Sequence, residues 1–182
     1  MTPEAERDYR KALRRIKEAE ENKSVELDLG GLENLSSFPP ELASLTSLQS
    51  LNLTRCTQLS DLRPLAALTS LQSLNLSMCE QLSGDLTPLA GLTSLQRLLV
   101  AGCKLSGDLS PLAELKSLQS VNLSKCIGIR RFSPLESLLP TLHALYLYGC
   151  NSWTSLRESA AQAARKMSSI KSAFSMEKTS IK

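Results

Sequence analysis

The chain has 182 residues, enough for one domain with a hydrophobic core, and its net charge is only +3. Leucine dominates the apolar residues whereas aromatic residues make up 4%, so a core must be filled by many similar aliphatic side chains. The weak charge argues against a nucleic-acid or membrane-surface binder. No stretch approaches the roughly 18 consecutive apolar residues that a membrane-spanning helix needs.

Residues 1–23 are predicted to form an N-terminal capping helix. This segment is densely charged and lacks the apolar stretch of a signal peptide. Thr2, Pro3 and Glu4 are typical of a helix start, because threonine caps free amides, proline suits the first turn and an acid complements the helix dipole. The apolar side chains that follow have helical spacing, at Tyr9, Ala12, Leu13, Ile16 and Ala19. We expect this face to cover the first repeat.

Residues 24–150 repeat with a period of 23 or 24 residues. Five cysteines mark the period, at Cys56, Cys79, Cys103, Cys126 and Cys150. Each cysteine closes the motif L-x-x-L-x-L-x-x-C, in which Val100 and Val121 each replace one leucine. A degenerate first copy begins at Val25 and has Leu32 in the cysteine position. The sequence therefore predicts six coils.

This motif resembles the leucine-rich-repeat family over about residues 24–150. Most members have asparagine where this chain has cysteine, which is a known variant. The second half of each repeat, as in Ser60-Asp61-Leu62-Arg63-Pro64, is similar to the short internalin-like or SDS22-like subclass. The resemblance implies that the cysteine column turns inward and helps to bond the backbone of the loop.

The alternation within the motif predicts how each coil is built. The leucines of L-x-L face inward and the x positions face outward. Short helical or 3-10 turns are predicted at the prolines, with caps at the preceding aspartates Asp61, Asp85 and Asp108. In two coils the Ser-Gly-Asp-Leu turn is expected to be longer by one residue, at Gly84 and Gly107. No coil buries its leucines alone. The predicted fold is therefore an α/β right-handed solenoid, with a curved parallel sheet on its concave face and helical turns on its convex face.

Residues 151–182 are predicted to form a C-terminal capping helix and tail. Ser155 and Glu158 match a capping box. The apolar side chains recur at steps of three and four, at Leu156, Ala160, Ala163, Met167, Ile170 and Phe174. The segment also holds six basic and two acidic residues. Its basic side chains are expected to line the solvated face of the cap, to contact an acidic partner or lipid headgroups, or to lie beside a partner helix.

Neither a cofactor nor a metal site is predicted. The cysteines come from different coils rather than from close pairs, so they are expected to be a structural ladder of small buried side chains. The sequence holds no phosphate-loop, dinucleotide-binding or hydrolase motif. A thiol enzyme that uses Cys150 with the single histidine, His143, is the remote alternative.

The outward positions of the concave face are mostly small and polar, with two exceptions. Arg97 and Leu99 replace serine and asparagine in the fourth coil, and Tyr146 and Tyr148 do so in the sixth. Tyrosine and arginine are enriched at interface hot spots. The predicted partner-binding residues are Arg97, Leu99, Asn122, His143, Tyr146 and Tyr148. The alternative is that the two tyrosines pack against the C-terminal cap, where Trp153 is also expected.

These features predict a non-enzymatic scaffold or adaptor that binds a protein partner through the concave face. The alternative is a structural subunit of a larger complex, held by its caps and convex side. Nucleic acid is not an expected partner, because the repeats are slightly acidic and lack a basic stripe. An odd number of cysteines without a C-x-x-C pair indicates a reducing, intracellular setting, and the cytoplasm is the expected location.

Overall fold

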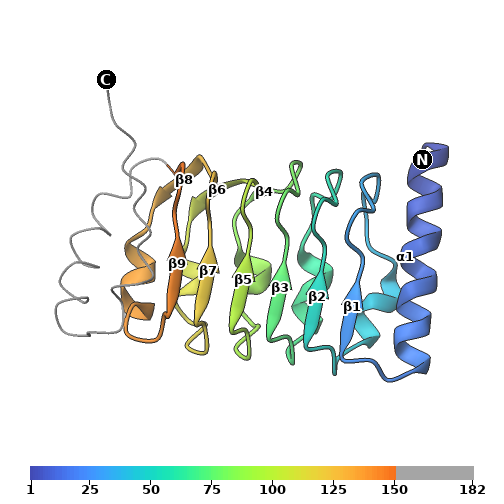
Figure 1. Cartoon of the computed structure of the whole chain (residues 1–182), viewed down its shortest axis with the longest axis horizontal. Coiled ribbons are helices and arrows are strands. Elements are labelled where there is room, and N and C mark those ends of the chain that lie inside the picture. Colours follow the sequence, from blue (N-terminus) through green and yellow to red (C-terminus); the bar gives the residue numbers. More distant parts are fainter. Residues whose placement is uncertain (151–182) are drawn as a thin grey trace.

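The computed structural model describes residues 1–150, and in this range the chain forms a row of stacked coils behind one N-terminal helix (Figure 1). Six short strands lie side by side in a parallel sheet in the order β1-β2-β3-β5-β7-β9. Their bounds are Glu26–Asp28 (β1), Ser50–Asn52 (β2), Ser73–Asn75 (β3), Arg97–Leu99 (β5), Ser120–Asn122 (β7) and Ala144–Tyr146 (β9). The solenoid and its parallel sheet confirm the fold that the repeats predict.

The central residue of each strand points into the core. Leu51 pairs with Leu74, which pairs with Leu98, and the register continues through Val121 to Leu145. All five side chains are buried. The residues on either side of them face outward and are more exposed. The period-two alternation thus separates a leucine core from a free sheet surface.

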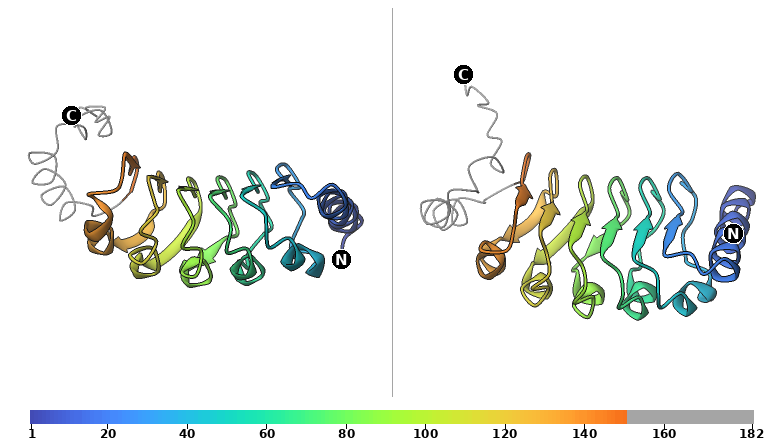
Figure 2. Two further views of the ribbon diagram at one scale, coloured as in Figure 1. Left: turned by 90° about the horizontal axis from the view of Figure 1, so that it is seen from below. Right: turned by 60° about the horizontal axis from the view of Figure 1, so that its bottom comes forward.

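The convex side of the solenoid is built from short 3-10 helices, which Figure 2 shows stacked along the row. They are η1 (Pro40–Ser44), η2 (Arg63–Ala67), η3 (Thr87–Leu89), η4 (Ser110–Leu112) and η5 (Ser133–Leu138). The aspartates do not occupy the cap position, which belongs to Leu62 in η2. Instead, Asp61 Oδ1 accepts a hydrogen bond from the Arg63 amide at 2.9 Å and closes the turn one residue earlier.

A second parallel sheet runs along the edge between the two faces. It has the order β4-β6-β8, with the bounds Ser83–Gly84 (β4), Lys104–Asp108 (β6) and Gly128–Arg131 (β8). The sequence predicted only a longer turn here. Gly84 and Gly107 adopt φ values of +92° and +94°, which favour glycine, so the extra residue is accommodated inside a strand.

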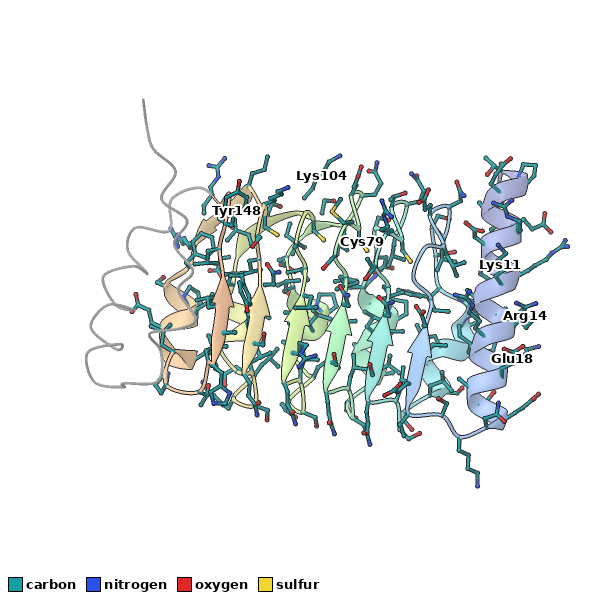
Figure 3. The ribbon with its side chains drawn as sticks, viewed as in Figure 1. Lys11, Arg14, Glu18, Cys79, Lys104 and Tyr148 are labelled. Carbon is teal, nitrogen blue, oxygen red and sulfur yellow. The ribbon has the colours of Figure 1, made fainter. Side chains whose placement is uncertain are left out.

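The helix α1 (Pro3–Glu21) covers the first coil, as expected of an N-terminal cap. Thr2 Oγ1 accepts a hydrogen bond from the Ala5 amide at 3.2 Å. Ala12, Ile16 and Ala19 are buried against the coil, whereas Lys11, Arg14 and Glu18 project away from it (Figure 3).

A buried carboxylate that the apolar stripe did not predict fixes this cap. Asp8 is 3% exposed, and its Oδ2 accepts hydrogen bonds from the backbone and side-chain nitrogens of Asn34, both at 3.1 Å. Burial acts to raise the pKa of Asp8, but the bonds from Asn34 and the charge of Arg7 outweigh it and lower the pKa. The ionised carboxylate therefore ties helix and first coil together.

The C-terminal capping helix and basic tail predicted for residues 151–182, including Trp153, lie outside the described residues.

Candidate functional site

The structure brings four of the six predicted partner-binding residues onto three neighbouring strands. Leu99 of β5, Asn122 of β7 and Tyr146 of β9 are paired in register and form one row across the sheet. Arg97 heads the adjacent row, followed by Ser120 and Ala144. Since neighbouring strands lie about 4.8 Å apart, Leu99 and Tyr146 stand about 10 Å apart on either side of Asn122.

The two tyrosines are the large exposed side chains of this region. Tyr146 is 45% exposed and Tyr148 is 63% exposed. Tyr148 follows β9 and lies near the carboxyl ends of β7 and β9 (Figure 3). Leu99 and Asn122 are half-buried, and Arg97 is exposed. We call Arg97, Leu99, Asn122, Tyr146 and Tyr148 the concave patch.

His143, the sixth predicted residue, lies at the opposite end of β9 from Tyr148. It is exposed and directly precedes β9, and its backbone amide donates to the Gln119 carbonyl at 2.7 Å. Tyr148 lies beyond the opposite end of the same strand. His143 is therefore at the margin of the concave patch.

The asparagines of the concave face, of which Asn122 belongs to the concave patch, have a local structural task. Asn52, Asn75 and Asn122 each accept through Oδ1 a hydrogen bond, 3.0 Å long, from the amide two residues further on. Asp28 does the same in the first coil, with its Oδ1 2.8 Å from the Gly30 amide. A side-chain oxygen at this position thus closes the turn that leaves the strand. The sequence suggested only a solvated polar face for Asp28, Asn52 and Asn75, and a partner-binding role for Asn122.

Leu99 and Tyr146 stand at the same position of their coils and cannot close this turn. A leucine has no acceptor, and the hydroxyl of tyrosine lies at the far end of its ring. Such hydrogen bonds contribute about 0.5–1.5 kcal/mol each. The fourth and sixth coils therefore forgo a local stabilisation and gain apolar surface on the concave face in its place.

The cysteine column is an internal ladder that connects successive coils. Its five side chains are buried and unpaired. Each thiol donates to a carbonyl of the coil before it, as Cys79 Sγ does to Leu53 O at 3.2 Å and Cys126 Sγ to Val100 O at 3.1 Å. The other bonds are 3.3 Å from Cys56 to Leu29, 3.1 Å from Cys103 to Leu76 and 2.9 Å from Cys150 to Leu123.

The ladder and the histidine do not form a catalytic pair in the structure. The Cys150 thiol is bonded to the Leu123 carbonyl, while His143 is exposed at the other end of β9. A thiol needs a base within hydrogen-bond reach to become a nucleophile. Among residues 1–150, no cluster of histidine, cysteine or acidic side chains could hold a metal ion.

We predict that all five thiols are protected from a thiol reagent in the folded protein. Burial raises the pKa of every one, to about 11 for Cys56 and Cys103 and to about 12 for Cys126. At pH 8 a thiol with a pKa of about 11 is ionised in roughly one molecule per thousand, and one with a pKa of about 12 in roughly one per ten thousand, while the thiolate is the reactive form. Ellman's reagent should therefore react slowly before unfolding and with five thiols per chain in denaturant.

Mass spectrometry of the modified protein supplies the control by reporting each position separately. Comparable slow rates at Cys79 and Cys150 are expected. A Cys150 rate far above that of Cys79 would contradict the structural role of the ladder and favour thiol chemistry.

Comparison with known proteins places these features in a family. Residues 46–91 match the family described as leucine-rich repeats in two copies. Internalin C2 of Listeria monocytogenes is 34% identical with a TM-score of 0.59, and the match covers 70% of this chain and 52% of that one. A second internalin of that organism, InlF, is 34% identical with a TM-score of 0.55, over 66% of this chain and 38% of its own.

A plant structure resembles the chain more distantly. The plant peptide hormone receptor RGFR1, solved in complex with RGF2, is 26% identical with a TM-score of 0.52, and the match covers 62% of this chain and 18% of the receptor. No curated protein matches the chain.

The repeat motif, the matched family and the solenoid together identify the chain as a leucine-rich-repeat protein. It spans only 38% and 52% of the two internalin chains that it matches. Leucine-rich repeats generally mediate protein–protein interaction through the concave surface of the solenoid, typically without catalysis. Within residues 1–150, no helix is both long enough and apolar enough to cross a membrane.

Proposed function

We propose that the chain is a non-enzymatic scaffold or adaptor that binds a protein partner through the concave patch. The proposal depends above all on one observation, the replacement of the turn-closing asparagine by Leu99 and Tyr146 on either side of Asn122. Departures from a repeat's own stabilising pattern are expected where a surface serves function. The side chains gained include tyrosine, one of the types enriched at interface hot spots.

The surroundings of the patch favour this function. Ser120, Ser124 and Ala144 are small residues between the larger side chains, which leaves room for a bound segment. The strands are held by a continuous leucine core, so the surface is ordered before binding. A preorganised surface loses little conformational entropy when a partner binds.

The test is a pair of substitutions that restores the repeat. Leu99→Asn with Tyr146→Asn should close both turns, so we expect thermal stability at least equal to that of the wild type. The full-length variant and the wild type are used as baits in extracts of the cells that produce the protein, with mass spectrometry as the readout. We expect a partner held by the wild type to be lost by the variant, because its apolar contacts are gone.

The matched control is Ser50→Ala with Ser73→Ala, on β2 and β3 of the same face but outside the concave patch. This control should retain the partner. Retention by the restored variant, or equal loss in the control, would contradict the proposed site. Loss only on changing the convex side or the segment after residue 150 would favour a structural subunit held in a larger complex.

We further propose a reducing, intracellular location. Its support is that all five cysteines are free, although neighbouring coils place them close enough for the backbone spacing of a disulfide. In an oxidising compartment such thiols would be a liability.

A further inference from the structure

Charge is unequally divided along the axis of the solenoid. Coils 1–3, residues 24–94, hold two basic and seven acidic side chains, a net charge of −5. Coils 4–6, residues 95–150, hold six basic and three acidic side chains, a net charge of +3. The half that carries the concave patch is therefore the positive half.

Four of these six cations gather on the edge formed by β6, β8 and the turn after β7. They are Lys104, Lys125, Arg130 and Arg131, and all four are exposed. Figure 3 shows Lys104 extending outward from this edge. Among the described residues, no ion pair within 4.0 Å involves any of them. We call this set the cationic rim.

The rim adjoins the concave patch through Lys125. The Lys125 amide donates to the Tyr148 carbonyl at 2.6 Å. The Cγ atom of Lys125 also lies 3.4 Å from the position that a Cβ atom would take on Gly149. A molecule seated on Tyr148 therefore meets Lys125 of the rim directly.

One rim residue, Arg131, stands where the repeat favours something else, whereas Lys125 stands at a position that glycine shares with other residues. Lys125 adopts a φ of +61°, as Arg55 and Met78 do at this position with +63° and +64°, and Gly102 and Gly149 occupy it in the coils on either side. A non-glycine residue in this region costs roughly 1 kcal/mol. Arg131 stands where Asp61 closes the turn in the second coil, so it gives up that bond.

One carboxylate lies beside the rim and does not neutralise it. Asp108 is paired in register with Arg131, one of its oxygens accepts a hydrogen bond from the Ser110 amide, and the bonds from Ser110 together with the charge of Arg131 lower the pKa of this carboxyl. With Asp108 included, the edge keeps a net charge of +3. The cations are therefore not explained by pairing within the solenoid.

We propose that the cationic rim, together with the concave patch, binds an acidic segment of a protein partner. This inference rests on the proposed function and adds the chemistry of the partner. Carboxylates would meet the rim while apolar side chains meet Leu99, Tyr146 and Tyr148. A long polyanion fits less well, because it would extend over coils 1–3 with their net charge of −5.

The test uses a fluorescein-labelled peptide of twelve residues that is rich in glutamate and contains leucine and tyrosine. Its binding to the full-length protein is measured by fluorescence anisotropy at two salt concentrations. We expect the wild type to bind it more weakly as salt increases, because the rim contacts are exposed. Lys104→Glu with Arg130→Glu should weaken binding at least tenfold.

The matched control is Lys11→Glu with Lys116→Glu, which makes the same change in net charge on α1 and on the convex side. It should bind the peptide within about twofold of the wild type, because neither lysine belongs to the rim or to the patch. Equal loss in both double variants, or no binding by the wild type, would overturn the proposal. So would tighter, rim-dependent binding of a DNA duplex or of phosphatidylserine vesicles.

The two proposals can fail separately. If extracts yield a partner that the Leu99→Asn, Tyr146→Asn variant loses and the rim variant keeps, the acidic segment is wrong and the binding function stands. If both variants keep the partner, both proposals are wrong.

Discussion

Leu98→Ala is expected to destabilise the solenoid by about 2–5 kcal/mol, the range for a buried leucine whose removal leaves a cavity. Leu98 is fully buried at the centre of β5, and its register partners are Leu74 and Val121. Each coil contacts only its neighbours, so a cavity in the fourth coil weakens the packing that joins the first three coils to the last two. Urea unfolding followed by circular dichroism measures the free energy of unfolding.

The residue next to it offers a control with the same chemistry. Leu99 lies on the same strand but faces outward and is half-buried. Leu99→Ala should cost less than about 1 kcal/mol, because it opens no internal cavity. Equal losses for the two variants would contradict the assignment of inner and outer faces.

Gly128→Ala is expected to destabilise the protein by about 1–3 kcal/mol, as overpacking does. A Cβ at this position would lie 2.4 Å from the Leu105 carbonyl oxygen and 3.4 Å from Ser106 Cα. Those atoms belong to the backbone of β6 and cannot rotate away, so β6 and β8 must separate. The loss should appear as a lower midpoint in thermal and urea unfolding.

Gly91→Ala is the matched control, because nothing lies within 4 Å of its Cβ position and its φ is not in the left-handed region. It should leave stability unchanged or raise it by up to about 1 kcal/mol, since alanine restricts the unfolded chain. If Gly128→Ala were as well tolerated, the close approach of β6 and β8 would be wrong.

Much of the fold could be predicted because one physical pattern repeats. The L-x-L alternation decides which side chains enter the core, and Leu51 and Leu74 are buried as it requires. The sheet β4-β6-β8 could not be predicted in this way. Its strands are two to five residues long and lack alternating leucines. Their pairing depends on backbone approach at Gly128, for which a sequence period carries no signal.

The repeat period also predicts which residues of the concave patch face outward. It does not predict the hydrogen bonds by which the asparagines of this face stabilise the turns. The asparagine at each strand end looked like a solvated residue, whereas Asn75 closes a turn at 3.0 Å. This bond joins residues two apart and depends on a turn geometry seen only in three dimensions. A signal for the rim was present in the sequence, since Arg130-Arg131 stand where the second coil has Ser60-Asp61.

The opposite net charges of the two halves also act before any contact is made. They give the solenoid an electric dipole along its length, and the field of such a dipole rotates an approaching charged molecule during diffusion. Dissolved ions damp this field beyond about 10 Å at 0.1 M salt. Ionic strength should therefore alter how fast a complex forms more than how long it lasts.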